Sequence, residues 1–360
     1  AAAAAAAAAV AQPSTPAAQT GQGEDRGRGG LGGHVPTAVF RMCSCRPDQA
    51  VSLYFRVKDD DVPSSYVYLQ LVCSFADSSS GGRRKTRVCT RRLRSTSDPV
   101  SFLRSLDTKV TAVLMLKRSI LLSLQPSALG GFSLPAVHSD LKKQLLHVMA
   151  VYGRRHQEPD GTGSGLYLPA ELQYLPVCVY HALRGPMLGT IVQHPDDTCV
   201  QRLVFLNAGR EACSRMLVPS LLSFNSSGHT DQLALCNIAQ QSNRLLYLDH
   251  HTHIFIWSGS SVAGPEFDLY RSAWVQKAES SSSTRFPTPA VYVFTEGSSA
   301  ARWLDCRLAP SHKDTPQQME TDYPPIALLS AEDRSELLSK FLPTDELSFH
   351  QFYKQLQRDL

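Results

Sequence analysis

Apolar and polar residues alternate with a period of two between residues 38 and 93, which predicts β-strands. Two sets of apolar side chains each share one strand face, namely Val51, Leu53, Phe55 and Val57, and then Val67, Leu69, Leu71, Cys73 and Phe75. The run Asp-Ser-Ser-Ser-Gly-Gly at 77–82 predicts a hairpin connection. We expect residues 35–96 to form a partial antiparallel β-sandwich, because a sheet with one apolar face needs a second layer.

The spacing of apolar residues becomes helical between residues 98 and 222. A first helix is expected to start at Asp98-Pro99 and to extend to Leu124. Three more helices are expected, starting near Ser139, Pro169 and Asp196. Pro176 should kink the third of these helices or shift its start. We therefore predict an all-α helical domain at residues 97–225, with a polar loop at 158–165.

Strands and helices mix from residue 226 to the C-terminus. Apolar and aromatic runs predict strands at 244–248, 254–257 and 291–294. Helical spacing predicts helices at 267–278 and 347–356. The stretch 314–343 is acidic and rich in proline. The mixture predicts a C-terminal α/β domain at 226–360, so the fold class is multidomain α+β.

Composition limits the classes of function. The chain has 360 residues, enough for two or three domains, and a net charge of +4 that gives no indication of nucleic-acid binding. The nine cysteines are scattered and odd in number, which favours reduced thiols in apolar cores of a cytosolic protein. No Cys-x-x-Cys pair is present, so we expect no metal site in this chain.

The N-terminal segment has low complexity. Residues 1–34 begin with nine alanines and continue with a stretch rich in Pro, Gln and Gly. This composition predicts a disordered linker and indicates a fragment of a longer protein. No later apolar run reaches the roughly 18 residues that a membrane-spanning helix needs, so we expect a soluble protein.

The most informative stretch is Arg285-Phe286-Pro287-Thr288-Pro289, followed after a predicted strand by Gly297-Ser298-Ser299-Ala300-Ala301-Arg302. The prolines hold the first segment extended, and Ser298 or Ser299 is expected to cap a helix. Arg302 would then lie at the start of that helix, directly after a flexible turn. By pattern alone, Arg302 is either an arginine that acts on a partner's phosphate or an ordinary surface arginine.

Several segments together resemble the GTPase-activating subunit of the inner COPII vesicle coat, the Sec twenty-three type. Besides the two arginine segments, the matching residues are Thr37, Phe40, Arg41 and Met42, Ala112 to Met115, Met216 to Pro219, Arg244 to Asp249, Ile254 to Gly259, Thr344, Asp345, Ser348 and Phe352. The resemblance covers about residues 36–360. The stretch 314–343 is longer than usual for this family, and we interpret it as an insertion without chemistry. The resemblance implies that the C-terminal α/β domain is gelsolin-like and that the protein functions in transport from the endoplasmic reticulum to the Golgi.

In this family, the arginine at the position of Arg302 enters the nucleotide site of a Sar-type small GTPase as an arginine finger. The resemblance assigns support of the GTPase contact to Arg285, Phe286, Pro287, Gly297 and Ser299. The chain would be a GTPase activator without an active site of its own, and it would hold no cofactor. GTP and Mg²⁺ would belong to the partner GTPase, and zinc would be expected only in the part of the family that precedes the sandwich.

The implied partners, besides the GTPase, are the cargo-binding inner-coat subunit and the outer-coat subunit. The implied location is the cytoplasm, peripheral on the endoplasmic reticulum membrane and on COPII vesicles. The densest basic cluster consists of Arg83, Arg84, Lys85, Arg87, Arg91, Arg92 and Arg94. This cluster is either a solvated strand face or a surface that faces an anionic membrane.

Two other functions and one other site also fit parts of the sequence. The first alternative is the cargo-binding sister subunit of the same coat, which should lack the arginine motif. The second is a gelsolin-type actin-binding module, which the strand at 254–259 would fit. The run Asp249-His250-His251-Thr252-His253 resembles a metal site, but strand alternation would separate its imidazoles, so we expect histidines at a solvent edge.

Overall fold

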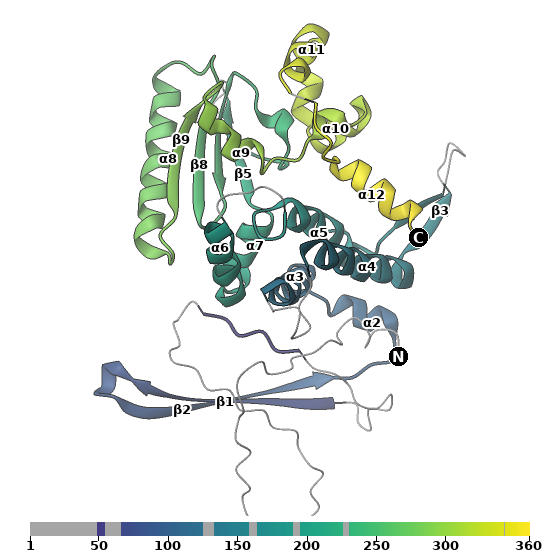
Figure 1. Ribbon diagram of the computed structural model, residues 1–360, viewed down its shortest axis with the longest axis vertical. Helices are drawn as coiled ribbons and strands as arrows, with labels where there is room; N and C mark the ends of the chain where they lie inside the picture. Colours follow the sequence, from purple (N-terminus) through teal and green to yellow (C-terminus); the bar gives the residue numbers. More distant parts are fainter. Residues whose placement is uncertain are drawn as a thin grey trace, which may run out of the picture.

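The computed structural model describes residues 49–54, 66–124, 133–157, 164–189, 195–225, 230–341 and 343–360. Figure 1 shows an isolated β-hairpin, a group of helices above it, and a sheet flanked by helices farthest from the hairpin. The predicted linker at 1–34, the centre of the predicted polar loop at 158–163, and the family-like residues Thr37 to Met42 lie outside the described residues. Among the helices of the described parts, none is both long and apolar enough to cross a bilayer.

The predicted hairpin is confirmed. Strand β1 (Tyr66–Asp77) pairs antiparallel with β2 (Arg83–Arg94) along its whole length. The connection begins with a turn of 3₁₀-helix, η1 (Ser78–Ser80), in which the Asp77 carboxylate accepts a hydrogen bond from the Ser79 N–H. Gly81 and Gly82 follow with φ angles of 70° and 79°, a conformation that favours glycine.

The hairpin differs from the expected half-sandwich. Its predicted apolar face is exposed, with 49% of Leu71 and 44% of Phe75 accessible to solvent. Within the described residues no second sheet covers either face of this ribbon. The period of two therefore predicted β1 and β2 correctly, whereas the burial that usually accompanies it is absent. The strand expected at 51–57 is not confirmed, because residues 51–54 form no strand and residues 55–57 lie outside the described residues.

The helical part has one continuous core and consists of α2 (Pro99–Arg104), α3 (Thr108–Leu124), α4 (Leu134–Tyr152), η3 (Ala170–Leu172), α5 (Leu175–Arg184), α6 (Pro195–Asn207) and α7 (Arg210–Leu217). A short hairpin of β3 (Arg154–Gln157) and β4 (Ser164–Tyr167) follows α4. Leu116, Leu141 and Leu175 are almost completely buried at the centre of this core. The predicted apolar stripes therefore face one another.

Local capping explains where the helix ends differ from the predictions. Asp98 accepts hydrogen bonds from the N–H groups of Val100 and Ser101, so the predicted start is confirmed. The single helix expected from 98 to 124 is interrupted after Arg104, because Asp107 accepts from the Val110 N–H and begins a new helix. The second predicted helix starts at Leu134 instead of Ser139. Pro176 lies in the first turn of α5 and shifts its start, as expected.

The C-terminal part is built on a five-stranded sheet with the order β6-β5-β7-β8-β9. Its strands are β5 (Ser220–Asn225), β6 (Thr230–Leu233), β7 (Arg244–Asp249), β8 (His253–Ser258) and β9 (Ala290–Thr295). All neighbours are antiparallel except β8 and β9, which are parallel and are connected through α8 (Pro265–Thr284). Residues 220–225 were expected to end the helical domain, but they pair with β7 over six residues and belong to the sheet.

Helices cover both faces of this sheet (Figure 1). On one face Leu245, Tyr247 and Ile256 pack against Phe267 and Trp274 of α8. The opposite face carries Phe255 and Trp257 and is covered by the segment after β9. That segment contains η5 (Ser299–Ala301), α9 (Arg302–Asp305), η6 (Ser311–Lys313), α10 (Pro316–Asp322), η7 (Pro324–Leu328) and α11 (Ala331–Ser339).

The stretch 314–343 is an integral part of this second layer and not a detached insertion. Thr315 and Gln318 form a capping box at the start of α10. Met319, Tyr323 and Ile326 are at most 4% exposed and pack into the core of the sheet. The sequence did not reveal this role, because short helices interrupted by proline show little periodicity.

The C-terminal helix α12 (Phe349–Arg358) connects the two larger parts. Its existence is confirmed, but Phe352 and Leu356 pack into the core of the helical part and not against the sheet. The Tyr180 hydroxyl donates to the Leu347 carbonyl at 2.7 Å, and Arg184 forms an ion pair with Glu346. The chain end therefore fastens the sheet part to the helices.

The cysteines are free thiols in the described residues, as expected. Cys178, Cys213 and Cys236 are buried. The expectation that the cysteines lie mostly in apolar cores is wrong for Cys73 and Cys89 of the hairpin, and for Cys199 of α6, which are exposed.

If η7 is part of the core, Ile326→Ala should lower the free energy of unfolding by about 2–4 kcal/mol, since the buried side chain leaves a cavity. Leu328→Ala is the matched control on the same turn, because Leu328 is 88% exposed, and it should change stability by less than about 0.5 kcal/mol. Urea denaturation of the two variants measures the difference. Equal effects would show that this segment does not contribute to the core.

Candidate functional site

Arg302 is the first residue of α9 and is exposed. Its guanidinium forms no hydrogen bond or ion pair with any residue that the structure describes. The turn before it contains Gly297, whose φ of 76° favours glycine, and Ser298 precedes η5 without forming a side-chain cap. The predicted helix start is therefore confirmed in position, and the arginine is available at the surface.

The turn before Arg302 is held in place by Glu296. Its carboxylate accepts hydrogen bonds from the Ser260 N–H at 2.7 Å, from the Ser242 hydroxyl at 3.0 Å and from the Lys340 ammonium at 3.2 Å. Burial alone would raise the pKa of Glu296, but these hydrogen bonds outweigh burial and the pKa is lowered. Because the donors come from the β7–β8 end of the sheet and from α11, the turn is anchored at both sides.

The rest of α9 packs onto the sheet. The ring of Trp303 is stacked on Tyr292 of β9, with 6.5 Å between the centroids, and Leu304 is 1% exposed. The following Arg307 is buried as well. Because these neighbours are packed, the backbone of Arg302 is held in place, while its own side chain is exposed and unpaired among the described residues.

Arg285 has a different environment. Its guanidinium donates two hydrogen bonds of 2.8 Å to the two carboxylate oxygens of Asp249, and only 18% and 16% of these side chains are exposed. Burial would raise the pKa of Asp249, but the hydrogen bonds from Arg285 and from the His251 N–H lower it. Arg285, which directly follows α8, therefore fastens the end of that helix to the end of β7 inside the chain.

The structure separates the two predicted halves of the arginine site. Arg285, Phe286 and Pro287 precede β9, whereas Gly297 and Ser299 follow it. Six residues of strand place these ends about 20 Å apart, at roughly 3.3 Å per residue. Phe286 is 64% exposed at its end of the strand and precedes a cis peptide bond to Pro287. Only Gly297 and Ser299 lie next to Arg302 along the chain.

His250 and His251 are buried in the turn between β7 and β8, and His253 is the half-buried first residue of β8, so the expectation of histidines at a solvent edge is wrong. His250 is 3% and His251 is 6% exposed. The reason is that the turn lies against the helical part, where Gln201 of α6 forms a hydrogen bond with His253 at 3.4 Å. Burial lowers the pKa of His250 well below its usual value and that of His253 to about 4, so both imidazoles are neutral at pH 7.

One group of polar side chains was missed by the sequence reasoning. Ligand-type atoms of Asp314, Asp322 and His350 lie within 4.8 Å of one another. His350 forms a hydrogen bond of 2.7 Å with Asp322, and the Ser348 hydroxyl donates to Asp314. These contacts link α12 to α10. Only the capping residue Ser348 gave a signal in the sequence.

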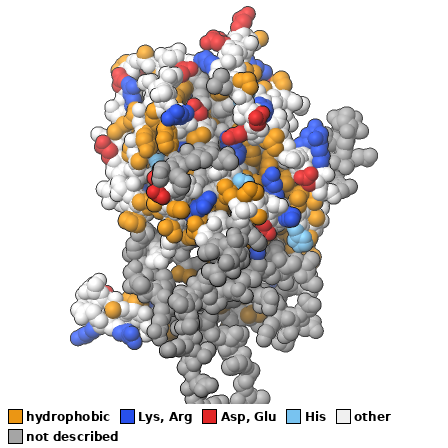
Figure 2. Space-filling model, in the orientation of Figure 1, with side chains coloured by type: hydrophobic (Ala, Val, Ile, Leu, Met, Phe, Trp, Pro, Cys, Tyr) orange, Lys and Arg blue, Asp and Glu red, His pale blue; other side chains and the backbone are white. Residues whose placement is uncertain are grey.

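The basic cluster occupies both faces of the hairpin. Strand alternation places Arg83, Lys85, Arg87 and Arg91 beside the exposed apolar row of β1, and Arg84, Arg92 and Arg94 on the other face. Lys85 forms an ion pair with Asp77, and the Arg92 guanidinium lies 4.5 Å from the centroid of the Tyr66 ring. In Figure 2 basic side chains gather at the projecting end of the hairpin. A basic and apolar ribbon of this kind can contact an anionic surface.

Asp249→Asn should lower the free energy of unfolding by about 2–3 kcal/mol, because it removes one charge of a largely buried pair. Asp268→Asn is the matched control, since Asp268 is 66% exposed where it pairs with Arg271, and it should change stability by less than about 0.5 kcal/mol.

The lowered pKa of Asp249 stabilises the fold above the usual pKa of aspartate. The difference between wild type and Asp249→Asn should therefore shrink below about pH 4. Denaturation curves at pH 7 and pH 3.5 test both statements.

The chain is similar to a known helical domain, to two plant transport proteins and to a solved human coat protein. The model of the Sec23/Sec24 helical domain matches residues 107–215, which comprise α3 to most of α7. The chain is 33% identical to "Protein transport protein SEC23 A" of Arabidopsis thaliana over 322 residues, which are 88% of this chain and 35% of the relative. It is 24% identical to "Protein transport protein SEC23 C" of the same plant over 302 residues, which are 78% of this chain and 38% of that relative.

Among solved structures, the human COPII-coat protein Sec24c has a TM-score of 0.56 to this chain. The sequence identity is 16%, and the match covers 81% of this chain and 37% of the human chain, so it shows the fold alone. The chain spans between 35% and 38% of the length of the curated relatives it matches. The resemblance is thus confirmed: residues 107–215 form a Sec23/Sec24 helical domain, and the chain is a sequence relative of the Sec23 transport proteins.

Proposed function

We propose that this chain is part of an inner-coat subunit of the COPII vesicle coat and that it stimulates GTP hydrolysis by a Sar-type small GTPase. Arg302 is the arginine finger of this proposal. The observation that carries it is the exposed Arg302 guanidinium, which has no partner among the described residues and which follows the anchored turn at Gly297. The 33% identity to a Sec23 protein supports the choice of coat subunit.

The chemistry of the proposal is electrostatic. Hydrolysis of GTP increases negative charge on the oxygens between the β- and γ-phosphates, and a guanidinium placed beside them stabilises that charge. Arginine suits this role because it is permanently charged and offers several N–H donors in one plane. The backbone at Arg302 is held in place by its packed neighbours, and its guanidinium is unpaired among the described residues. No internal hydrogen bond or ion pair therefore has to break before this side chain enters the nucleotide site of a partner.

The role of Arg285 is indirect in this proposal. Its guanidinium is occupied by Asp249, so it orients the start of β9 and does not itself reach the GTPase. Exposed Phe286, with Pro287, Gly297 and Ser299, is available for contact with the GTPase at either end of the strand. The gelsolin-like character of the C-terminal α/β part belongs to the same proposal.

The two alternatives differ in what Arg302 does. The cargo-binding sister subunit has the same fold, as the likeness to Sec24c indicates, so the fold does not separate the two. The higher identity to Sec23 relatives and the free Arg302 favour the activator. A gelsolin-type actin-binding module is disfavoured because the sheet part is joined to a Sec23/Sec24 helical domain through α12. Actin co-sedimentation tests that alternative.

In the same proposal the chain acts in the cytoplasm, peripheral on the endoplasmic reticulum membrane and on COPII vesicles. Its partners are the GTPase, the cargo-binding inner-coat subunit, the outer-coat subunit and an anionic membrane surface, and not nucleic acid. GTP and Mg²⁺ are supplied by the GTPase, and any zinc by other parts of the coat subunit. The basic and apolar hairpin β1–β2 is the surface that meets the membrane.

Arg302→Ala should lower the stimulated rate of GTP hydrolysis by about 10³-fold or more, because the charge that stabilises the transition state is removed. Arg302→Lys should restore little of it, since lysine lacks the planar set of donors. Release of phosphate from the GTP-loaded Sar-type GTPase, with and without the chain, measures the rate. The melting temperature should stay unchanged, because the exposed Arg302 side chain forms no hydrogen bond or ion pair with a described residue.

Arg271→Ala is the control for a general loss of positive charge, since Arg271 is partly exposed on α8 and pairs with Asp268 of the same helix. It should leave the stimulation unchanged. The proposal is wrong if the wild-type chain gives no stimulation, or if Arg302→Ala stimulates as well as wild type does.

Replacing Arg83, Arg87 and Arg91, which share the face of the exposed apolar row, by Ser should weaken binding to vesicles that contain phosphatidylserine by about 100-fold, at about 1 kcal/mol for each basic residue near the headgroups. The control replaces the exposed residues Arg104, Lys354 and Arg358 by Ser, which removes the same charge elsewhere. Vesicle flotation at low and high salt measures binding. Equal binding by both triple variants would exclude the hairpin as the membrane surface.

A further inference from the structure

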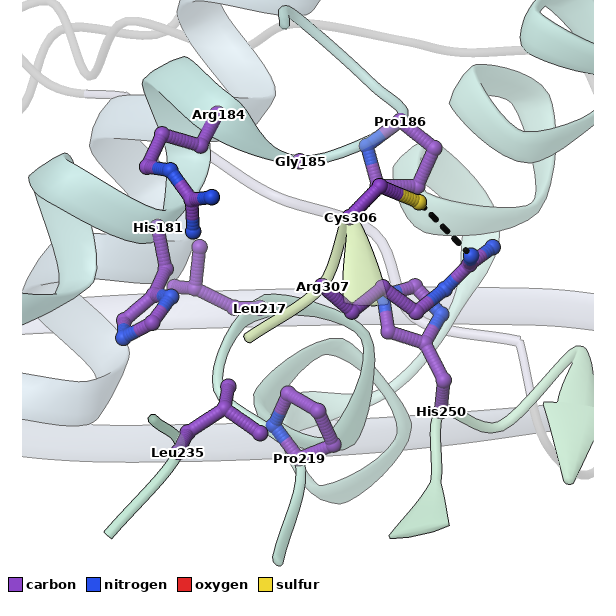
Figure 3. Close-up of a pocket in the computed structure, with 10 residues that line it drawn as sticks. All are labelled: His181, Arg184, Gly185, Pro186, Leu217, Pro219, Leu235, His250, Cys306 and Arg307. Carbon is purple, nitrogen blue, oxygen red and sulfur yellow. Dashed lines mark hydrogen bonds between the residues drawn. The ribbon is translucent and has the colours of Figure 1, made fainter. Parts of the chain in front are cut away.

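A small cavity lies where the helical part meets the sheet part. His181 and Arg184 of α5 line one side, and His250 and Arg307 line the other (Figure 3). Leu217 and Pro219 are among the apolar residues that complete the wall. Its volume of about 20 Å³ holds a single water-sized guest. The two parts of the chain therefore line a pocket whose polar side chains are two guanidinium groups, two imidazoles and one thiol.

Arg307 is an incompletely paired buried cation. The residue is only 5% exposed. One terminal nitrogen, Nη1, donates to the Trp303 carbonyl and lies 3.6 Å from the Cys306 sulfur. Nε and Nη2 are inaccessible to solvent and have no hydrogen-bond partner among the residues that the structure describes. Burying a guanidinium without a counter-charge lowers the stability of the fold. Arginine cannot avoid this penalty by losing its proton, because its side chain stays charged in proteins.

No other described residue neutralises this charge. Arg307 forms no ion pair with a described carboxylate. Burial raises the pKa of the Cys306 thiol, so the sulfur is uncharged at pH 7. The Phe255 ring lies 4.7 Å from the guanidinium carbon, but a ring face attracts the cation from above its plane and accepts nothing from the in-plane Nε–H and Nη2–H groups.

The remaining polar groups of the cavity add no negative charge. Arg184 is itself neutralised by Glu346 and also donates to the Leu308 carbonyl. Burial lowers the pKa of His181 to about 3 and that of His250 well below its usual value, so both imidazoles are neutral at pH 7. The Nδ1 atom of His250 is buried without a hydrogen-bond partner. The cavity thus carries one uncompensated positive charge.

From the unpaired Arg307 guanidinium and the small volume of this cavity, we infer that the interface between the helical part and the sheet part binds one monatomic anion, with chloride as the physiological ligand. The one uncompensated positive charge of Arg307 favours a ligand that carries a single negative charge. The volume admits a halide, and it excludes phosphate and sulfate, which need several times the space of one water. Arg307 provides the charge and its Nε–H and Nη2–H donors, after a small rotation toward the cavity. His181 and His250 provide imidazole N–H donors from the two sides.

A bound anion at this place would stabilise the contact between the helical part and the sheet part. Since its ligands come from α5, from the β7–β8 turn and from the residues after α9, the anion fastens the two parts of the chain together. Arg307 follows α9 directly, so the same ion holds the base of the helix on which Arg302 lies. This inference does not depend on what Arg302 does.

Thermal unfolding of the 360-residue chain at constant ionic strength tests the site, with sodium chloride compared with sodium gluconate. Wild type should melt about 2–4 °C higher in 200 mM chloride than in gluconate, because an ion that binds only the folded state stabilises it. Sulfate at equal ionic strength should not replace chloride. Arg307→Leu should abolish the difference between chloride and gluconate. Arg302→Ala, which removes a charge five residues away on the exposed side of α9, should retain it.

A second measurement is independent of the variants, since Arg307→Leu replaces a buried residue and its fold can suffer. Crystals of wild type grown in sodium bromide should show one anomalous bromide peak between Arg307 and His250. The inference is overturned if wild type melts equally in chloride and gluconate, if the chloride effect persists in a folded Arg307→Leu variant, or if the cavity holds water and no bromide.

Discussion

The parallel pairing of β8 with β9 is the constraint from which the arrangement of the C-terminal part follows. Two parallel neighbours cannot be joined by a tight turn, so the chain between them must cross over the sheet, and here α8 does so. The crossover covers one face of the sheet with Phe267 and Trp274. The chain that leaves β9 is then free to cover the opposite face, which brings α9 and the segment to α11 into place.

The same constraint gives two arginines opposite roles. Arg285 lies where the crossover ends, beside the last residue of β7, and a buried carboxylate there would be unpaired without it. Arg302 lies beyond the other end of β9, on a helix whose neighbours Trp303 and Leu304 are packed while its own side chain faces outward. Burial with a counter-charge turns one arginine into a structural anchor. Exposure without one leaves the other available for a partner.

The interface between the helical part and the sheet part is polar in an unusual way. α12 contributes apolar contacts through Phe352 and Leu356, but the β7–β8 turn brings buried histidines to the same interface. Their imidazoles are neutral because burial opposes protonation, so they cannot repel Arg307 strongly. The interface therefore tolerates a buried cation, whose remaining donors require a partner that fits the space beside them.

Part of this protein follows from its sequence alone. The alternation in β1 and β2, the Asp98-Pro99 start of a helix, and the apolar runs of β7, β8 and β9 depend on near neighbours and on local hydrogen bonds, so the pattern of residues was sufficient to predict them. Arg302 could be singled out for the same reason, because a glycine turn followed by a helix start is a local feature. The resemblance to a coat subunit rested on such segments as well.

Other features were decided only by the tertiary structure. The burial of His250 and His251, the pairing of β5 with the sheet, and the role of Ile326 in the core depend on segments far apart in the sequence. The pair Arg285–Asp249 and the unpaired Arg307 are of the same kind, since residue type does not reveal whether a counter-charge lies within reach. Local pattern determined which elements form. Long-range packing determined which side chains lose water, and the loss of water sets their charge, their partners and their function.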